Sequence, residues 1–206
     1  MALRLHAVTP ADSAQQPHVL RDGARVIAFR DLAAIVTDRD KFSLDEVDPA
    51  LADEHRQIVD TVFKSQAALP TPAGIVFRTE HVLLRWMELH YVALTDAIAF
   101  VTDRAAARVH VSRAGGSKEN KEAGSDLAEA ASGIFRELRR RAVASVPLTT
   151  EQVTGIVLSG AFLVERELWA EFERGFNEAR KSNPDLRVEL TGPWAPYDFV
   201  RMQLGD

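Results

Sequence analysis

The chain has 206 residues, of which 46% are hydrophobic and 27% charged, with 9 prolines, 11 glycines and no cysteine. These values indicate one large or two small folded domains and exclude a fibrous chain, a disulfide-stapled domain and thiolate metal sites. The formal net charge of −5 argues against a general polyanion-binding surface.

The N-terminal region begins with strand patterns. Apolar and polar residues alternate over 2–8, which predicts a strand with one buried face. This stretch lacks the continuous apolar run of a signal peptide, so we expect no export signal. After a weakly helical stretch, Asp22-Gly23 predicts a turn, and the apolar runs at 25–29 and 32–36 predict a hairpin.

A firm helix prediction follows. Asp48 can cap the helix, and Pro49 suits its first position. One stripe at helical spacing is formed by Leu51, His55, Ile58, Val59, Val62 and Phe63. We therefore expect this stripe, including the histidine, to face the core.

The rest of the first half is predicted as a broken strand and a helix. Two prolines and a glycine interrupt the apolar pattern over 69–77, so we expect an interrupted or edge strand there. Thr79 can cap one long helix whose apolar face recurs until about Asp103.

The second half alternates strand and helix patterns. We expect strands over 108–112, 143–148, 155–164 and 186–190, helices around 127–138 and 168–179, and a polar loop over 115–125. The longest apolar run, 155–164, is about half the roughly 20 residues that a membrane-spanning helix needs. We therefore expect no membrane span.

Together these elements predict an α+β protein of two small, closely packed domains, 1–104 and 105–206. The second has the order βαββαβ of a ferredoxin-like fold, and the first shows an imperfect version of the same order. Little sequence is left between them for a linker.

Catalytic, cofactor and metal motifs are missing from the sequence: it has no GxSxG, no P-loop and no GxGxxG. His81 and His90 lie nine residues apart on the predicted helix, hence on opposite faces, so they cannot share a metal ion. Glu54 and His55 are neighbours that point in different directions, and His55 belongs to the apolar stripe. We expect His55 to be a buried structural residue.

One basic run occurs in the chain, formed by Arg136, Arg139, Arg140 and Arg141. Nucleic-acid binding is one interpretation of such a run. The favoured interpretation is the C-terminus of a helix, where arginine interacts favourably with the helix dipole.

The segment 190–200 concentrates three aromatic residues and two prolines. Pro193 and Pro196 fix the backbone, and Gly192 permits a bend at the end of the last strand. Two interpretations remain open. The favoured one is an ordered loop that covers the core of the second domain, and the other is a docking surface made of rigid aromatic side chains.

Residues 191–199 read TGPWAPYDF, which resembles the C-terminal signature TGPWPPYSF of the GvpL/GvpF gas vesicle proteins. Ala195 and Asp198 are the departures from that wording. Further stretches fit the family in chain order, at 31–36, His55, 69–77 and 161–164. Where the family usually has Arg-Phe-Gly, this chain has Thr-Pro-Ala-Gly at 71–74. The resemblance covers essentially the whole chain.

The resemblance implies an accessory protein of gas vesicle formation that binds the hydrophobic shell protein, other accessory proteins, or both. It implies a cytoplasmic, vesicle-associated protein that is not an enzyme. From the missing motifs, the charge balance and the short apolar runs we expect no cofactor, metal, membrane or nucleic-acid partner. The signature residues are then possible partner contacts, namely Thr191, Gly192, Pro193, Trp194, Pro196, Tyr197 and Phe199. The alternative is a small-molecule sensor or enzyme on a ferredoxin-like scaffold, with His55, His81 and His110 as its candidate residues.

Overall fold

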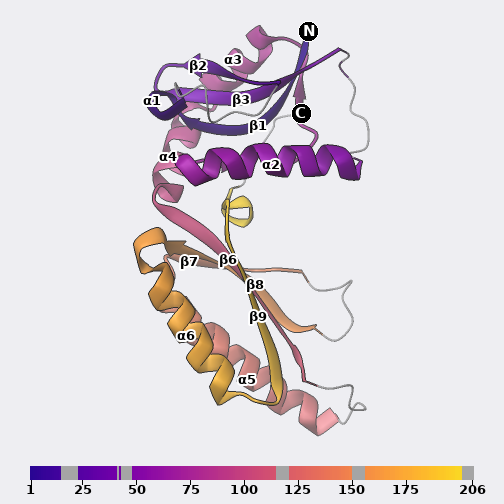
Figure 1. The fold of residues 1–206 in the computed structure, drawn as a ribbon, viewed down its shortest axis with the longest axis vertical. Coiled ribbons are helices and arrows are strands. Elements are labelled where there is room, and N and C mark those ends of the chain that lie inside the picture. The colour runs from indigo at the N-terminus through magenta and orange to yellow at the C-terminus, as the bar shows by residue number, and fades with distance from the viewer. Residues whose placement is uncertain (15–22, 41, 43–47, 115–120, 150–155, 201–206) are drawn as a thin grey trace. The chain divides into compact units, whose positions relative to one another are not determined.

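The computed structural model describes residues 1–14, 23–40, 42, 48–114, 121–149 and 156–200. The chain forms two compact units, and the second comprises Arg104–Trp194. The first unit comprises Met1–Asp103 and is joined by the C-terminal residues from Ala195 onward. Each unit combines one antiparallel sheet with helices (Figure 1), so the predicted α+β class is confirmed.

The sheet of the first unit is antiparallel, in the order β2-β3-β1-β4, with β5 also paired to β1. Its strands are β1 (Ala2–Pro10), β2 (Ala24–Phe29), β3 (Leu32–Arg39), β4 (Leu69–Pro70) and β5 (Val76–Phe77). The predicted hairpin and the predicted broken strand are both confirmed. The hairpin turns at Arg30, whose φ of 56° lies in the left-handed region. After β1, helix α1 covers only Ala11–Ala14, and the rest of the predicted helical stretch lies outside the described residues.

Both faces of β1 are buried, so the expectation of a single buried face is wrong. Leu3 and Leu5 belong to the apolar core formed with α3 (Glu80–Leu89) and α4 (Tyr91–Val101). On the other face, Arg4 and His6 interact with residues of α2 (Pro49–Ser65). Because helices cover the sheet on both sides, polar residues of β1 cannot be solvent-facing.

Helix α2 begins as predicted. Pro49 occupies its first turn, and Asp48 Oδ1 accepts a hydrogen bond of 2.8 Å from the Leu51 backbone N–H. The predicted stripe is buried at His55, Ile58, Val59, Val62 and Phe63.

We expect Asp48→Ala to lower the free energy of unfolding by about 1 kcal/mol, because an amide at the start of α2 loses its acceptor. Denaturant titration followed by circular dichroism measures this change. Asp53→Ala is the matched control on the same helix, since it removes only an exposed ion pair with Arg56 worth about 0.5 kcal/mol or less. Equal losses for the two variants would show that the cap contributes nothing of its own.

The single long helix expected from Thr79 to Asp103 is wrong, because the structure has two helices that meet at His90. The backbone of His90 adopts φ −104° and ψ 11°, outside the helical region. Its ring Nδ1 lies 2.9 Å from the carbonyl oxygen of Trp86. Asp103, at φ 57°, then ends the first unit's chain segment in a left-handed conformation.

The second unit has the predicted order βαββαβ, with an antiparallel sheet in the order β7-β8-β6-β9. Its elements are β6 (Arg104–Arg113), α5 (Lys121–Arg139), β7 (Ala144–Pro147), β8 (Ile156–Glu165), α6 (Trp169–Ser182) and β9 (Leu186–Trp194). A short 3₁₀ turn, Arg166–Leu168, precedes α6. Helix α5 includes residues 121–125, so the prediction of a loop over 115–125 is wrong for these residues. Residues 115–120 lie outside the described residues.

Helices α5 and α6 cover one face of the second sheet (Figure 1). The core on this face contains Val109, Ile134, Phe162, Phe172 and Val188. Within the described residues, no helix of either unit is long and apolar enough to cross a membrane.

The C-terminal segment corrects our domain boundaries. We had placed all of 105–206 in the second domain, but the residues from Ala195 onward cluster with the first unit. Val200 packs against the apolar core of the first unit, and Ala195 is buried. The chain passes from the first unit to the second between Asp103 and Arg104.

Candidate functional site

The first half of the C-terminal signature, residues 191–194, is the end of β9. Thr191 pairs with Arg108 and Trp194 with Ala106, and the register shifts between these two pairs. All four residues are exposed, with Trp194 at 40%. Because β9 is an edge strand of its sheet, this part of the signature offers both unpaired backbone and an accessible aromatic ring.

Gly192 is required at its position. Its φ is +133°, a conformation that other residues rarely adopt. A Cβ atom there would lie 2.7 Å from the carbonyl oxygen of Ala106 and 2.9 Å from the ring of Trp169. The glycine therefore lets β9 pass close to both β6 and α6.

The second half of the signature packs on the first unit, so our expectation that it covers the second domain is wrong. Ala195 and Pro196 are buried, and Tyr197–Phe199 forms a 3₁₀ turn. The ring of Tyr197 lies 6.2 Å from that of His55, between centroids. This contact fixes the segment against α2, which carries His55.

A buried polar cluster lies beneath α2 in the first unit. His6 and His55 are 0% and 3% exposed, and their Nδ1 atoms are 3.1 Å apart. His6 Nε2 forms a second hydrogen bond of 2.9 Å with Thr37 Oγ1. Arg4 is also buried and lies 3.9 Å from a carboxylate oxygen of Glu54.

Burial favours the neutral forms of both histidines. Burial, followed by the nearby His55 and Arg4, lowers the pKa of His6 to about 3. Burial also lowers the pKa of His55, an effect that the nearby Thr71 backbone opposes and the charge of Arg4 reinforces. One imidazole must donate and the other accept in the Nδ1–Nδ1 hydrogen bond, so the pair can hold at most one proton in that bond. The cluster links β1, β3 and α2, and its two imidazoles are closed to solvent.

Within the first unit, the structure does not bring together His55 and His81, two candidate histidines of the alternative function. His55 contacts His6, whereas His81 is exposed on α3. His110, in the second unit, has its Nδ1 2.6 Å from Ser159 Oγ. In the described part of the chain, no three histidine, aspartate or glutamate side chains are grouped closely enough to hold a metal ion.

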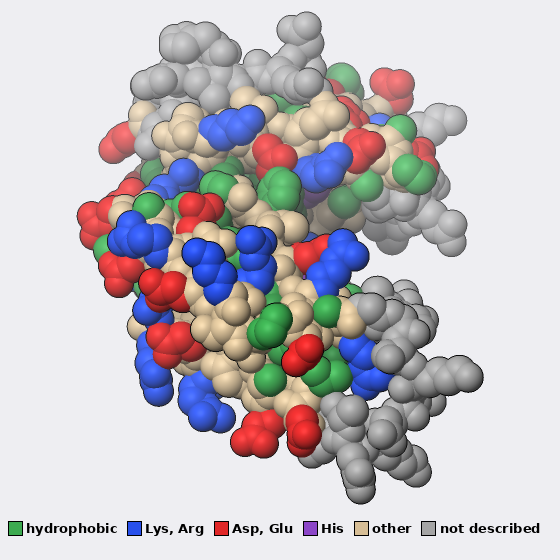
Figure 2. All heavy atoms as spheres, turned by 60° about the horizontal axis from the view of Figure 1, so that its bottom comes forward, with side chains coloured by type: hydrophobic (Ala, Val, Ile, Leu, Met, Phe, Trp, Pro, Cys, Tyr) green, Lys and Arg blue, Asp and Glu red, His purple; other side chains and the backbone are tan. Residues whose placement is uncertain are grey.

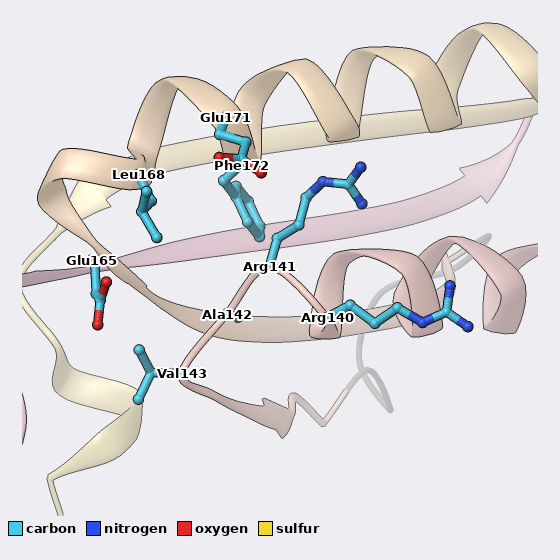
Figure 3. A pocket seen from close by; sticks show the side chains of 8 residues that line it. All are labelled: Arg140, Arg141, Ala142, Val143, Glu165, Leu168, Glu171 and Phe172. Atoms are coloured by element: carbon cyan, nitrogen blue, oxygen red, sulfur yellow. The ribbon is translucent and has the colours of Figure 1, made fainter.

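A hollow of about 250 Å³ lies in the second unit at the end of α5 (Figure 3). Val143, Leu168 and Phe172 supply apolar walls, and Glu165 lies at one side. Arg141 forms an ion pair with Glu137, and this interaction lowers the pKa of the Glu137 carboxyl. The lining of the hollow thus combines charges of both signs.

Sequence reasoning missed His6 as the partner of His55. In the sequence, His6 is a polar residue of an alternating strand, which is typical of a solvent-facing position. His55 was the signal that could have indicated such a partner, because a histidine on the buried face of a helix needs a hydrogen-bonding partner.

Residues 5–123 and 112–201 match the sequence model of a family described as gas vesicle synthesis protein GvpL/GvpF. These two matches span nearly the whole chain. The chain belongs to the GvpL/GvpF family. It is therefore a protein of gas vesicle formation, as the signature at 191–199 implied.

Individual members of the GvpL/GvpF family agree with this assignment. Gas vesicle protein F2 of Halobacterium salinarum is 23% identical over 188 residues, which cover 88% of this chain and 82% of that protein. The crystal structure of GvpF from Anabaena sp. PCC7120 superposes with a TM-score of 0.81 at 14% identity, covering 98% of this chain and 97% of that chain. For GvpF from Microcystis aeruginosa the TM-score is 0.79 at 13% identity, with coverages of 98% and 99%. Both likenesses support the α+β fold.

Proposed function

We propose that this GvpL/GvpF protein assists gas vesicle assembly by binding the hydrophobic shell protein and other accessory proteins. It does so in the cytoplasm, in association with vesicles, and without catalysing a reaction. The observation that carries the proposal is the exposed end of β9, where the family signature supplies Trp194 on an unpaired strand edge.

The chemistry of this edge suits a shell subunit before assembly. An extended segment of a partner can add to an edge strand through backbone hydrogen bonds. Pro193 fixes its own backbone angle, and Trp194 offers a large apolar surface with few rotatable bonds. Rigid aromatic residues of this kind often dominate protein interfaces.

Trp194→Ala should abolish most shell-protein binding while the protein remains folded. The test is affinity purification of the tagged protein from cells that make vesicles, with the shell protein quantified by mass spectrometry. We expect at least a tenfold loss of recovered shell protein, since an interface that centres on one aromatic residue loses most of its affinity without it.

Phe42→Ala is the matched control, because Phe42 is also 40% exposed and lies in the first unit. Both side chains are partly buried, so both substitutions should lower the free energy of unfolding by about 1 to 2 kcal/mol. Only Trp194→Ala should reduce the recovery of shell protein. Equal recovery from the two variants would refute the assignment of β9 as the binding edge.

A further inference from the structure

The other edge of the second sheet, β7, borders a separate cleft. This cleft has a volume of about 350 Å³ and lies between α5, β7 and β8. Its lining includes Phe135, Arg136, Arg139, Ser145, Leu158 and Phe162. All of its lining residues belong to the second unit, so the cleft is complete within one compact body.

The floor of the cleft is apolar. The rings of Phe135 and Phe162 pack together with their centroids 5.3 Å apart. Phe135 lies close to the sheet because Gly160 has no side chain: a Cβ atom there would be 2.5 Å from the ring. A large apolar side chain that enters the cleft would therefore meet aromatic carbon.

The rim of the cleft is basic. Arg136 and Arg139 are exposed, and Arg139 Nε donates a hydrogen bond of 3.0 Å to Ser145 Oγ on β7. Neither arginine has a carboxylate partner among residues that the structure describes. By contrast, Arg140 and Arg141 both pair with Glu137. The guanidinium groups of Arg136 and Arg139 therefore remain available to an anion of a partner.

The backbone beside this rim is also available. In the described sheet, β7 pairs only with β8, so its outer side has no strand neighbour. Proline is tolerated on edge strands, and Pro147 ends this one. An extended segment could therefore pair along Ala144–Val146.

We propose that β7 and the adjoining cleft bind an extended acidic segment of another protein. The segment adds to the sheet as a further strand beside β7, places one apolar side chain over Phe135 and Phe162, and directs carboxylates to Arg136 and Arg139. This surface goes beyond the proposed function, which rests on the opposite edge, β9.

Charge favours this occupant over two others. A second copy that paired through β7 would bring Arg136 and Arg139 of both copies together, and like charges repel in such a contact. A nucleic acid would require an extended basic surface, whereas the arginines next to this rim, Arg140 and Arg141, are paired with Glu137. Figure 2 shows acidic and basic side chains interspersed on one face of the molecule.

The test uses the full chain labelled with ¹⁵N and a synthetic peptide, acetyl-Ser-Glu-Thr-Leu-Thr-Glu-Ser-amide, titrated by nuclear magnetic resonance. Its two glutamates flank the leucine at every second position, so all three side chains lie on one face of an extended strand. We expect saturable shifts at the amides of Ala144–Val146. The double variant Arg136→Gln/Arg139→Gln should weaken binding at least tenfold, and added salt should weaken binding to the unmodified protein. Arg180→Gln, at an exposed site on α6 outside the cleft, should leave the affinity unchanged.

Three outcomes would overturn the proposal. One is equal binding of a peptide in which lysine replaces every glutamate, and another is the absence of shifts along β7 at millimolar acidic peptide. The third is concentration-dependent dimerisation that protects the β7 amides without any peptide, which would identify a second copy as the occupant. Because Trp194 is unchanged in every variant, these outcomes are independent of the proposed function.

Discussion

Acidification should weaken the folded protein: we expect the free energy of unfolding to fall by about 2 kcal/mol between about pH 6.5 and about pH 4.5 through His6 alone. Burial lowers the pKa of His6 from 6.5 to about 3. In this interval the unfolded chain binds a proton that the folded chain excludes, so stability rises with pH. The contribution of His6 is complete above pH 6.5 and is lost as the pH falls toward 3.

No acidic side chain among the described contacts of His6 stabilises its protonated, positively charged form. His55 from α2 and Arg4 from β1 both oppose a positive charge on His6. Thr37 on β3 is neutral, and Tyr197 from the C-terminal segment packs on His55. Glu54 and Asp48 are acids that interact with this group, and both interact with Arg4. When both imidazoles are protonated, two N–H groups face each other and the hydrogen bond between them is lost.

Denaturant titrations at a series of pH values measure this effect. His6→Gln should flatten the dependence, because it removes the titrating group and keeps a hydrogen-bonding side chain. His81→Gln, at an exposed position on α3, is the control and should retain the dependence. Should His6→Gln fail to fold, imidazole resonances of the unmodified protein decide the question. A midpoint for His6 near pH 6.5 would contradict the prediction.

Gly192→Ala should lower the free energy of unfolding by about 2 to 3 kcal/mol. An alanine at φ +133° is strained, and its Cβ would contact the Ala106 carbonyl oxygen at 2.7 Å. The backbone of β6 cannot yield without losing its pairing with β9, so the clash is not relieved by a simple rotation of a side chain. Thermal and denaturant unfolding measure the loss.

Gly133→Ala is the opposite case and serves as the control. Gly133 lies within α5, and a Cβ atom there would meet nothing within 4 Å. Alanine is the better helix former, so this substitution should stabilise the protein by about 0.5 to 1 kcal/mol. If both substitutions have the same sign, the close approach of β9 to β6 is not the reason for the glycine at 192.

Sequence patterns predicted most helices and strands because the signals that start and end them lie within a few residues of each other. Asp48 and Pro49 marked the start of α2, and the alternation on either side of Arg30 marked the hairpin. The break between α3 and α4 at His90 was not predicted, because apolar residues recur at helical spacing both before and after it. The continuation of β9 beyond residue 190 to Trp194 was not predicted, because Gly192 and Pro193 are residue types typical of loops.

The site was less accessible to such reasoning because it depends on contacts between distant residues. His6 and His55 are 49 positions apart, and the apposition of Tyr197 with His55 joins opposite ends of the sequence. The family resemblance identified residues 191–199 as important. It did not indicate that their two halves belong to different units, because that depends on which core accepts Val200.

The division of the signature between units has a consequence for biosynthesis. The second unit begins at Arg104 and ends at Trp194, on the paired strands β6 and β9, so it is inserted into the first unit with its two ends on neighbouring strands. A ribosome therefore completes the inserted unit before it releases Tyr197 and Val200. The inserted unit has all its residues once Trp194 emerges, whereas the first unit gains the contacts of Tyr197 and Val200 only afterwards, even though its synthesis began earlier.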